Sequence, residues 1–296
     1  MLALVGPTGA GKSELALAAA ERVGAEIVAV DAFTVYRGMD VGTAKPDASA
    51  RRRVPHHCLD LLEVEQEADV AWFQQLARAA VAEVRARGRI PLLVGGSGLY
   101  FRAVVDPLSL PPTDPAVRAQ VARRYAGAPE EAHAALRAVD PDAAARIDPG
   151  NLRRTVRALE VQALTGQPFS AYRTTWDDRT SLYPGLQVIG VERDRAELTA
   201  RIAARTEAML AGGLIAECRA LGRRALSLTA RSAIGYREVL AHLAGECDVD
   251  AAAEAIRRRT RRYAVRQQRW FAADPRVHWS APHQVVALLT GSRHTT

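Results

Sequence analysis

The chain opens with a short apolar run that leads directly into a glycine-rich loop. Residues 2–5 read Leu-Ala-Leu-Val, and residues 6–13 read Gly-Pro-Thr-Gly-Ala-Gly-Lys-Ser, which matches the pattern G-x-x-x-x-G-K-S. Residues 14–23 follow with helical spacing. A strand, such a loop and a helix in this order form a phosphate-binding unit, because the loop and the helix N-terminus turn backbone N–H groups toward phosphate oxygens. The complete motif in this context disfavours a glycine-rich turn without a ligand.

The loop contains all the groups that a phosphate ligand needs. The Lys12 ammonium supplies a point charge, and the Ser13 hydroxyl is placed to ligate Mg²⁺. Only Lys12 and Lys45 are lysines among the 40 Lys and Arg residues, and an ammonium and a guanidinium are not interchangeable at a phosphate cradle. We therefore expect a ligand with a diphosphate or a triphosphate. The residues expected to hold it are Gly6, Pro7, Thr8, Gly9, Ala10, Gly11, Lys12 and Ser13.

The charge balance favours an anionic partner larger than a nucleotide. The chain has 296 residues, of which 48% are hydrophobic, and a formal net charge of +7. These values suit a globular protein of one large or two modest domains, and the excess positive charge attracts anions. A compositional bias of the genome toward arginine would give the same net charge. The distribution of the arginines along the chain therefore has to show whether they bind an anionic partner.

Cysteine usage and the N-terminal residues bear on the compartment. Cys58, Cys218 and Cys247 have no metal-binding spacing and cannot all pair, which predicts a reducing environment. Residues 1–13 lack the basic lead of a signal peptide, and no apolar run is long enough to span a membrane. We therefore expect a cytoplasmic protein without membrane contact, and we expect a monomer.

Short apolar runs alternate with helical spacing in the first third of the chain. This alternation, beginning with a phosphate-binding loop, is typical of a parallel sheet covered by helices on both faces. We therefore predict an α/β protein of the P-loop NTPase-like class. The predicted strands are residues 2–5, 26–30, 90–94 and 186–191, and the first predicted helices are residues 14–23 and 68–87.

Between about residue 113 and residue 182 the strand signals vanish. Ala and Arg become frequent, and the Asp-Pro pairs typical of helix starts recur at Asp114, Asp140 and Asp148. We predict an all-helical insertion domain at 113–182 within a core of residues 1–112 and 183–296. The later predicted helices are residues 194–223, 229–245 and 250–273, and residues 292–296 are expected to fray.

The second predicted strand ends at Asp31. The C-terminal ends of parallel strands line the ligand crevice, so we expect this carboxylate beside the phosphate-binding loop. There it can bind Mg²⁺ through water or accept a proton from a nucleophile. The alternative is that Asp31 only caps the loop that follows, which contains Ala32, Phe33 and Thr34.

The third predicted strand is followed by glycines and a hydroxyl instead of an acid. Residues 95–98 read Gly-Gly-Ser-Gly, and residues 99–101 read Leu-Tyr-Phe. ATPases of this architecture often carry an acid at such a strand end to hold Mg²⁺ and water. Its absence favours a phosphate or base contact by Ser97, beside an apolar pocket formed by Leu99, Tyr100 and Phe101, over nucleotide hydrolysis.

Two arginines on the predicted helix 194–223 share a face. Arg201 and Arg205 are one helical turn apart. Close to the phosphate-binding loop they would clamp a departing diphosphate, whereas on a solvated surface they would have no special role. The sequence leaves both interpretations open.

Residues 254–272 predict a helix with an aromatic stripe and an otherwise basic surface, on which only Glu254 opposes the arginines. A merely solvated helix usually mixes signs, so this pattern favours binding to a nucleic-acid backbone. Residues 151–157 form a second basic patch. His56-His57-Cys58 superficially suggests a metal site, but adjacent residues seldom ligate one ion together, which favours a packed loop. The arginines expected to contact nucleic acid are Arg153, Arg154, Arg157, Arg258, Arg262, Arg266 and Arg269.

Taken together, these blocks resemble the tRNA dimethylallyltransferase (tRNA isopentenyltransferase) family, in its bacterial form without a zinc finger. The similarity covers nearly the whole chain in order, and the VDAFTVYRGMDVGTAKP and LLVGGSGLY blocks are far more specific than the loop motif alone. The resemblance implies that the loop binds dimethylallyl diphosphate with Mg²⁺ rather than ATP. It implies as acceptor the exocyclic amine of the adenosine 3′-adjacent to the anticodon in tRNA. The other matching blocks are GPTGAGKS, VPHHCLD, residues 114–118, RRTVRALE, AIGYRE and RRYAVRQQRWF.

The resemblance also implies roles for single residues. Asp31 would be the general base and Ser97 would lie at the reacting centre, while Arg201 and Arg205 would stabilise the diphosphate. The insertion domain would grip the anticodon stem-loop. The residues implied in tRNA binding besides the basic patches are Asp31, Ala32, Phe33, Thr34, Ser97, Arg118 and Arg231.

Two positions depart from the family pattern. The family's D-S-x-Q block, whose Ser and Gln help to recognise adenine, has Ala32 and Thr34 here. The usual Arg before the A-I-G-Y block is Ser232, with Arg231 one place earlier.

Two other classes of protein share part of this pattern. An ATP-dependent small-molecule kinase would have the same loop, sheet and Asp31, but it leaves the arginine-rich helix and the helical insertion unexplained. A non-enzymatic RNA-binding protein would explain the arginines but not a carboxylate beside a phosphate-binding loop. Transfer of label from dimethylallyl diphosphate to RNA separates the three.

Overall fold

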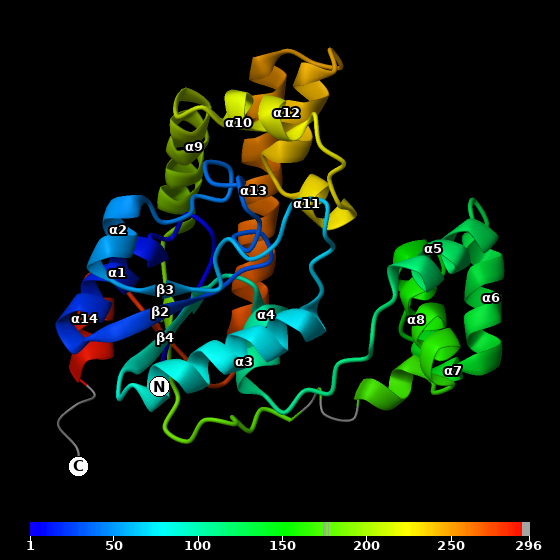
Figure 1. Cartoon of the computed structure of the whole chain (residues 1–296), viewed down its shortest axis with the longest axis horizontal. Helices are drawn as coiled ribbons and strands as arrows, with labels where there is room; N and C mark the ends of the chain where they lie inside the picture. The colour runs from blue at the N-terminus through cyan, green and yellow to red at the C-terminus, as the bar shows by residue number, and fades with distance from the viewer. Residues whose placement is uncertain (174–175, 177, 292–296) are drawn as a thin grey trace. The chain divides into compact units, whose positions relative to one another are not determined.

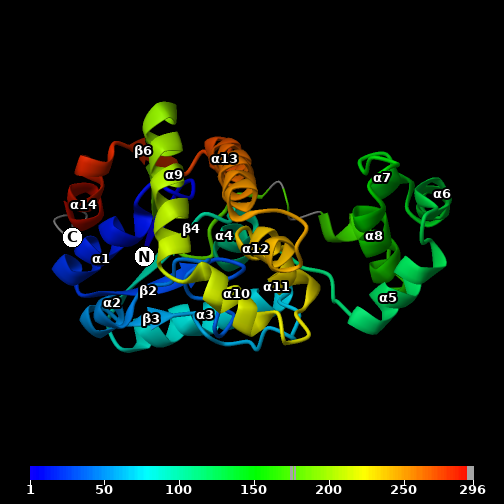
Figure 2. The ribbon, with the colours of Figure 1, turned by 90° about the horizontal axis from the view of Figure 1, so that it is seen from above.

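The computed structural model describes residues 1–173, 176 and 178–291, so the tail predicted to fray at 292–296 lies outside the described residues. A parallel six-stranded sheet has the order β3-β2-β4-β1-β5-β6. Figure 1 shows the sheet and its helices from the front, and Figure 2 shows them from above. The predicted parallel α/β fold is confirmed. The strands are β1 (Leu2–Val5), β2 (Ala25–Val30), β3 (His56–His57), β4 (Ile90–Gly95), β5 (Gln187–Val191) and β6 (Val277–Ser280).

The two strands at the edges of the sheet are missing from the sequence-based prediction. Strand β3 has only two residues, and β6 reads Val-His-Trp-Ser without an apolar run. An edge strand pairs on one side only, so it does not need the continuous apolar sequence of a strand buried on both faces. The four predicted strands form the interior of the sheet, where this signal is strong.

Helices α1 (Lys12–Val23) and α14 (Pro282–Gly291) pack against each other and against the sheet. The buried alanines of α1 recur at a spacing of three and four residues, which places them on one face of the helix. Their small side chains allow the helix to approach the strands closely. The cluster that joins these elements contains Leu4, Ala16, Ala19, Ala20, Val23, Leu92, Ile189, Val285 and Leu289.

Two long predicted helices are interrupted. Residues 194–223 form α9 (Arg195–Ala211) and α10 (Leu214–Leu221), because Gly213 between them takes φ 101°, which side chains strongly disfavour. Residues 229–245 form α11 (Leu228–Ser232) and α12 (Tyr236–Leu243). Within residues 1–173, 176 and 178–291, every helix is too short or too polar to reach across a lipid bilayer. The other helices here are α2 (Ala48–Arg53), α3 (Val70–Ala86), α4 (Gly98–Val105) and α13 (Val249–Ala272).

A second compact unit contains Asp69–Ala71 and the described part of Asp106–Leu182, so it begins before the predicted boundary at residue 113. Asp114 and Asp140 cap helices as predicted, whereas Asp148 accepts a hydrogen bond from Gly150 N–H and Asn151 is the cap. A small core of Leu136, Ala143, Ala144, Ile147 and Ala158 holds the unit together. Its helices are α5 (Pro115–Arg124), α6 (Pro129–Val139), α7 (Pro141–Ala144), α8 (Leu152–Thr165) and the 3₁₀ helix η1 (Phe169–Arg173).

Candidate active site

The glycine-rich loop connects β1 to α1 and closes around its own lysine. The Lys12 ammonium donates hydrogen bonds to the carbonyl oxygens of Gly6 (2.9 Å) and Pro7 (2.8 Å). Gly11 is the N-cap of α1 with φ 88°, and a Cβ there would come within 3.2 Å of the Arg201 guanidinium. The loop therefore needs glycine both for its backbone conformation and for the close approach of an arginine.

Three arginines approach this loop from β5 and from the helix that follows it. Arg201 Nε donates to Gly9 O (2.8 Å), and Arg205 Nη1 lies 3.3 Å from Thr8 Oγ1. Arg193 Nε, just beyond β5, donates to Ala10 O (2.8 Å). Of the two interpretations for Arg201 and Arg205, the geometry favours the one beside the phosphate-binding loop. The sequence analysis misses Arg193, although its place at the C-terminal end of a strand next to β1 is the same signal that singles out Asp31.

A glutamine on α13 ties the loop to the end of β4. Gln267 is 5% exposed. Its Oε1 accepts a hydrogen bond from Thr8 N–H (2.8 Å), and its Nε2 donates to Gly96 O (2.9 Å). The sequence analysis misses it, although an amide on the buried stripe of an arginine-rich helix is a detectable anomaly, since buried polar groups need partners.

Asp31 follows β2 and faces the same loop. Its Oδ1 accepts a hydrogen bond from Phe33 N–H (2.8 Å), so it does cap the following turn. Its other oxygen has no hydrogen-bond partner in the described part of the chain, which leaves that oxygen available to a substrate. Asp31 also lines a cavity together with Thr8 and Arg205. The two interpretations of Asp31 are therefore compatible.

That cavity has a volume of about 90 Å³ and two chemically different ends. Its polar end is formed by Thr8, Asp31 and Arg205. Its apolar part is formed by Ile202, Met209, Ala233, Ile234 and Ile256. Such a cavity suits a ligand with a charged head and a short hydrocarbon tail.

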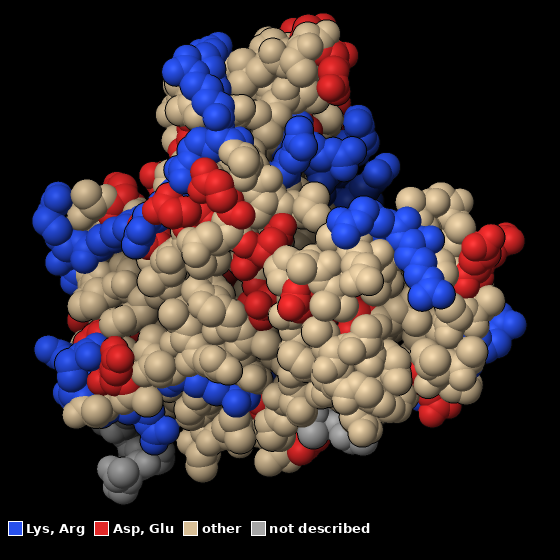
Figure 3. All heavy atoms as spheres, turned by 45° about the vertical axis from the view of Figure 1, so that its right-hand side comes forward, with Lys and Arg blue, Asp and Glu red and all other residues tan. Residues whose placement is uncertain are grey.

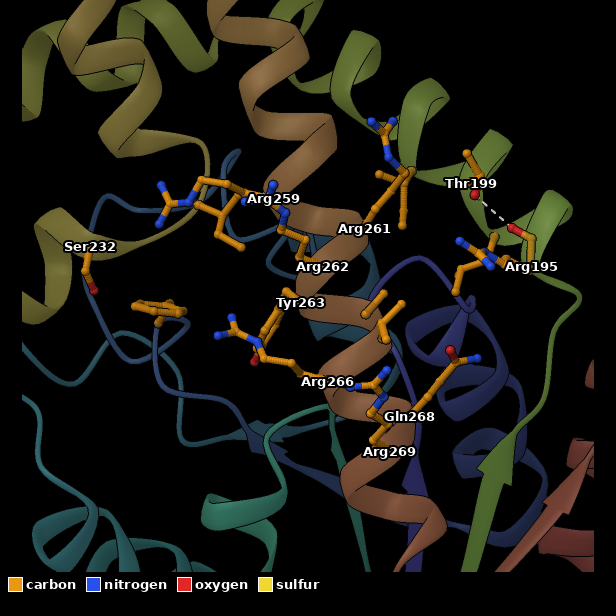
Figure 4. Close-up of a pocket in the computed structure, with 16 residues that line it drawn as sticks. Arg195, Thr199, Ser232, Arg259, Arg261, Arg262, Tyr263, Arg266, Gln268 and Arg269 are labelled. Carbon is orange, nitrogen blue, oxygen red and sulfur yellow. Dashed lines mark hydrogen bonds between the residues drawn. The ribbon is translucent and has the colours of Figure 1, made fainter. Parts of the chain in front are cut away.

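A larger groove of about 1180 Å³ adjoins the cavity, and both are lined by Phe33, Ile202, Ile234 and Tyr263. Figure 4 shows Tyr263 and Arg266 on one side of α13, while Arg261 and Gln268 project toward α9, which carries Arg195 and Thr199. The groove and the cavity are therefore adjacent, and arginines line the groove.

The exposed arginines of α13 differ from their paired neighbours. Arg258, Arg262, Arg266 and Arg269 are exposed, and none forms an ion pair with a carboxylate of the described residues. On the face shown in Figure 3, Lys and Arg side chains gather in separate groups. Within the segment 254–272 Glu254 is the only acid, but Glu207 and Glu238 from neighbouring helices also pair with its arginines. The ion pairs are Arg257 with Glu207 and Glu254, Arg259 with Glu238, and Arg261 with Glu254.

The arginines expected to bind tRNA from the helical unit fall into two groups. Arg118 and Arg157 form ion pairs of 2.8 and 2.9 Å with the fully buried Glu160. A buried carboxylate needs such partners, so these two arginines compensate the charge of Glu160 inside the unit. Arg153 and Arg154 are exposed on α8. Arg231 belongs to the other unit, which contains the sheet, and is exposed on α11.

Several other predicted residues lie outside the two cavities. Ala32, Thr34, Ser97 and Ser13 line neither of them. Thr34 Oγ1 is buried and has no hydrogen-bond partner in the described part of the chain. Ser97 directly precedes α4, where its carbonyl accepts a hydrogen bond from Phe101 N–H (2.9 Å).

The expectation that Tyr100 and Phe101 line an apolar pocket is wrong, since both are buried, and neither they nor the half-buried Leu99 line either of these two cavities. Tyr100 and Phe101 are buried in the core, where their rings pack 4.7 Å from Phe73 and 6.0 Å from Phe271. Helix α4 turns these two rings inward, so residues from α9, from α13 and from the segment between α11 and α12 form the apolar wall instead.

The histidine pair of the edge strand has structural partners. His57 Nε2 lies 2.7 Å from the Glu26 carboxylate, which also pairs with Arg87, and His56 Nδ1 lies 2.7 Å from Val54 O. No cluster of three metal-ligating side chains occurs among residues 1–173, 176 and 178–291.

Burial sets the charge state of the loop lysine. It lowers the pKa of Lys12 to about 7, with the positive charge of Arg205 acting in the same direction and Asp31 opposing both. Burial also lowers the pKa of Arg205, again opposed by Asp31. An anionic ligand would raise the Lys12 pKa again, because it favours the charged form.

This shift predicts proton uptake when diphosphate binds. At pH 8 a lysine with a pKa near 7 is mostly neutral, so binding should take up a proton at Lys12, and affinity should weaken as the pH rises above 7. Calorimetry with inorganic diphosphate in buffers of different ionisation enthalpy measures this uptake. The Lys12→Arg variant, which stays charged, is the control. Equal uptake by both proteins would contradict the prediction.

The fold and the site define a class of protein: a P-loop protein whose phosphate-binding loop adjoins a cavity that opens onto an arginine-lined groove. The chain belongs to the IPP transferase family, since the family model described as IPP transferase matches residues 34–274. A second model, described as isopentenyl transferase, matches residues 1–61.

Individual relatives agree with this assignment. The chain is 52% identical over 282 residues to the tRNA dimethylallyltransferase of Salinispora arenicola, covering 94% of this chain and 81% of the relative. It is 51% identical over 286 residues to that of Nocardia farcinica, covering 94% and 89%. The full-length tRNA isopentenylpyrophosphate transferase from Bacillus halodurans has a similar structure, with a TM-score of 0.70 at 34% identity over 98% of this chain and 94% of that one.

Proposed function

We propose that this protein transfers a dimethylallyl group from dimethylallyl diphosphate to the exocyclic amine of the adenosine 3′-adjacent to the anticodon in tRNA, and releases diphosphate. The observation that carries the proposal is the cavity. Asp31 and Arg205 share its polar end beside the phosphate-binding loop, hydrocarbon side chains form the rest, and the arginine-lined groove leads into it.

The reaction is a displacement at the allylic carbon. The amine nitrogen forms a bond to this carbon, and the carbon–oxygen bond breaks with its electron pair going to the diphosphate. Asp31 accepts the proton that the amine loses, because the adenine amine is a weak nucleophile until the proton can leave. Lys12, Arg201 and Arg205 stabilise the charge on the departing diphosphate. Holding the two reactants in line contributes up to roughly 7–11 kcal/mol.

The donor set suits a Mg²⁺ ion bound mainly by its substrate. The Ser13 hydroxyl stands in the first turn of α1, while Mg²⁺ prefers to keep water and phosphate oxygens rather than a full set of protein ligands. We therefore propose Ser13 as a Mg²⁺ ligand, with the ion neutralising diphosphate charge when bound. Asp31 would be a second group able to bind the ion, through water.

The acceptor base enters through the groove. An adenine must leave its stack to reach a buried carboxylate, which is easier in a single-stranded loop than in a duplex. Phe33 and Tyr263 line both the groove and the cavity, and their rings offer stacking surfaces for the base. This arrangement favours the anticodon loop of tRNA, and we propose a cytoplasmic monomer as the working form.

The decisive test uses unmodified tRNA and labelled dimethylallyl diphosphate. We expect label in the RNA at the adenosine 3′-adjacent to the anticodon, and one diphosphate released for each group transferred. A parallel reaction with labelled ATP and small-molecule acceptors tests the kinase alternative. Transfer of the ATP label without prenylation of RNA would overturn the proposal.

The volume of the cavity predicts a preference for a five-carbon donor. Its 90 Å³ is smaller than the ~150 Å³ of a cavity that takes up benzene, so a ten-carbon chain must displace the lining side chains. Relief of overpacking in Met209→Ala is expected to be worth about 1–3 kcal/mol. This corresponds to a roughly 5- to 150-fold rise in kcat/KM for geranyl relative to dimethylallyl diphosphate. The control is Val265→Ala, and an unchanged ratio would place the tail elsewhere.

A further inference from the structure

One buried amide joins two loops that would otherwise be independent. Gln267 accepts a hydrogen bond from Thr8 N–H in the phosphate-binding loop and donates one to Gly96 O beyond β4. Of the common side chains, only an amide of this length both accepts and donates in this way. The two hydrogen bonds thus fix the orientation of the amide and the separation of the two loops.

The two loops are packed so closely around the Gln267 amide that there is no space for a further side-chain atom. A Cβ at Gly96 would lie 2.1 Å from Gln267 Nε2 and 3.1 Å from Gly6 O. A Cβ at Gly95 would lie 2.0 Å from the carbonyl oxygen of Val30, the last residue of β2, which Asp31 follows. The ends of β1, β2 and β4 are therefore packed directly on each other, with Gln267 between two of them.

The helix that carries Gln267 also lines the groove. Tyr263 lies one turn earlier on α13 and lines both the groove and the cavity, and Arg266 precedes Gln267. Arg266 is 5.7 Å from the centre of the Tyr263 ring. One rigid helix thus carries groove arginines on its outer surface and a loop-binding amide on its inner surface.

We propose that Gln267 is a positioning residue for the donor diphosphate. By holding Thr8 N–H and Gly96 O, it keeps the phosphate-binding loop in its binding conformation and in register with the loop that carries Ser97. It does not touch the substrate. It also occupies Thr8 N–H, so Thr8 contacts the diphosphate through its hydroxyl. The inference rests on the proposed function for the identity of the donor, but not for the phosphate ligand.

The test is Gln267→Met, which has similar length but makes neither hydrogen bond. The expected result is an approximately tenfold higher Kd for inorganic diphosphate with Mg²⁺ and an equal rise in the donor KM, because the half-buried Thr8 N–H and the buried Gly96 O lose their partner. The KM for tRNA should change less than about twofold. Gln284→Met, the same change on an exposed part of α14, is the control. A purely structural role would lower Tm and the active fraction but leave both donor constants unaltered, and that result would overturn the inference.

Gln267→Glu adds a pH-dependent readout. A protonated glutamic acid both accepts and donates like the amide, whereas the carboxylate faces Gly96 O without a proton. Burial raises the pKa of a carboxyl group at this position above its ordinary value of about 4.3, so the ratio of its diphosphate Kd to that of the wild type should fall toward one as the pH falls. A ratio that does not change with pH would overturn the inference. Because diphosphate binding needs no transfer, absence of prenylation by the wild type would overturn the proposed function alone.

Discussion

Replacing Asp31 by Asn is expected to slow prenyl transfer by about two to four orders of magnitude, which is the usual contribution of a positioned base. The amide oxygen of Asn can still accept the hydrogen bond from Phe33 N–H that Asp31 Oδ1 accepts at 2.8 Å, so the loop should keep its shape. Only the ability to take a proton is lost. The affinity for tRNA and for diphosphate should change little.

The measurement is a single-turnover rate at saturating tRNA and donor, which excludes product release. Binding of inorganic diphosphate to the same variant serves as the internal control, because it reads the loop without the chemistry. A near-normal rate would remove Asp31 from the mechanism. A large loss of diphosphate affinity would instead show that Asp31 acts through the charge of Lys12 and Arg205, whose pKa values it raises.

The sequence predicts best what depends on local pattern. The glycine-rich loop, the interior strands and α13 each have a strong signal within a short stretch of sequence, and the structure contains all of them. The position of Asp31 also follows from a local pattern, because the end of a parallel strand determines which edge of the sheet the next residue reaches.

The missed parts of the site depend on packing between distant segments. Gln267 and Thr8 are separated by 259 positions, and the sequence around neither residue predicts their hydrogen bond. Tyr100 and Phe101 look like a ligand pocket in sequence, but the rotation of α4 turns them into the core beside Phe73 and Phe271. The apolar wall instead comes from α9, α13 and the segment between α11 and α12, whose apolar residues are indistinguishable in sequence from ordinary core positions.

The sequence is equally unable to predict which arginines are paired with acids from distant segments. Composition and spacing identify a basic helix, but they do not separate Arg262, which is exposed, from Arg259, which pairs with the buried Glu238 of another helix. Arg118 and Arg157 likewise match the expected basic pattern, yet both are bound to Glu160. Which arginines remain available to a phosphate backbone depends on where the carboxylates lie in three dimensions.

This distinction leads to the second large effect. Replacing Arg262, Arg266 and Arg269 together by Gln is expected to weaken the binding of every tRNA by about the same factor. All three line the groove and are exposed. Each lost phosphate contact should reduce the slope of log K against log salt by roughly 0.7–0.9, so three contacts reduce it by roughly 2.1–2.7. At 0.15 M salt this corresponds to about 50- to 170-fold weaker binding.

The matched control is the triple variant in which Arg22, Arg52 and Arg219 become Gln. These arginines are also exposed, and their loss changes the net charge by the same amount. If long-range attraction to the whole positively charged protein were sufficient, both triple variants would lose the same affinity. If the groove binds the phosphate backbone, only the first variant loses slope, while its Kd for inorganic diphosphate stays unchanged because the phosphate-binding loop is intact. An unchanged salt slope in the groove variant would mean that this surface of α13 faces solvent in the complex with tRNA.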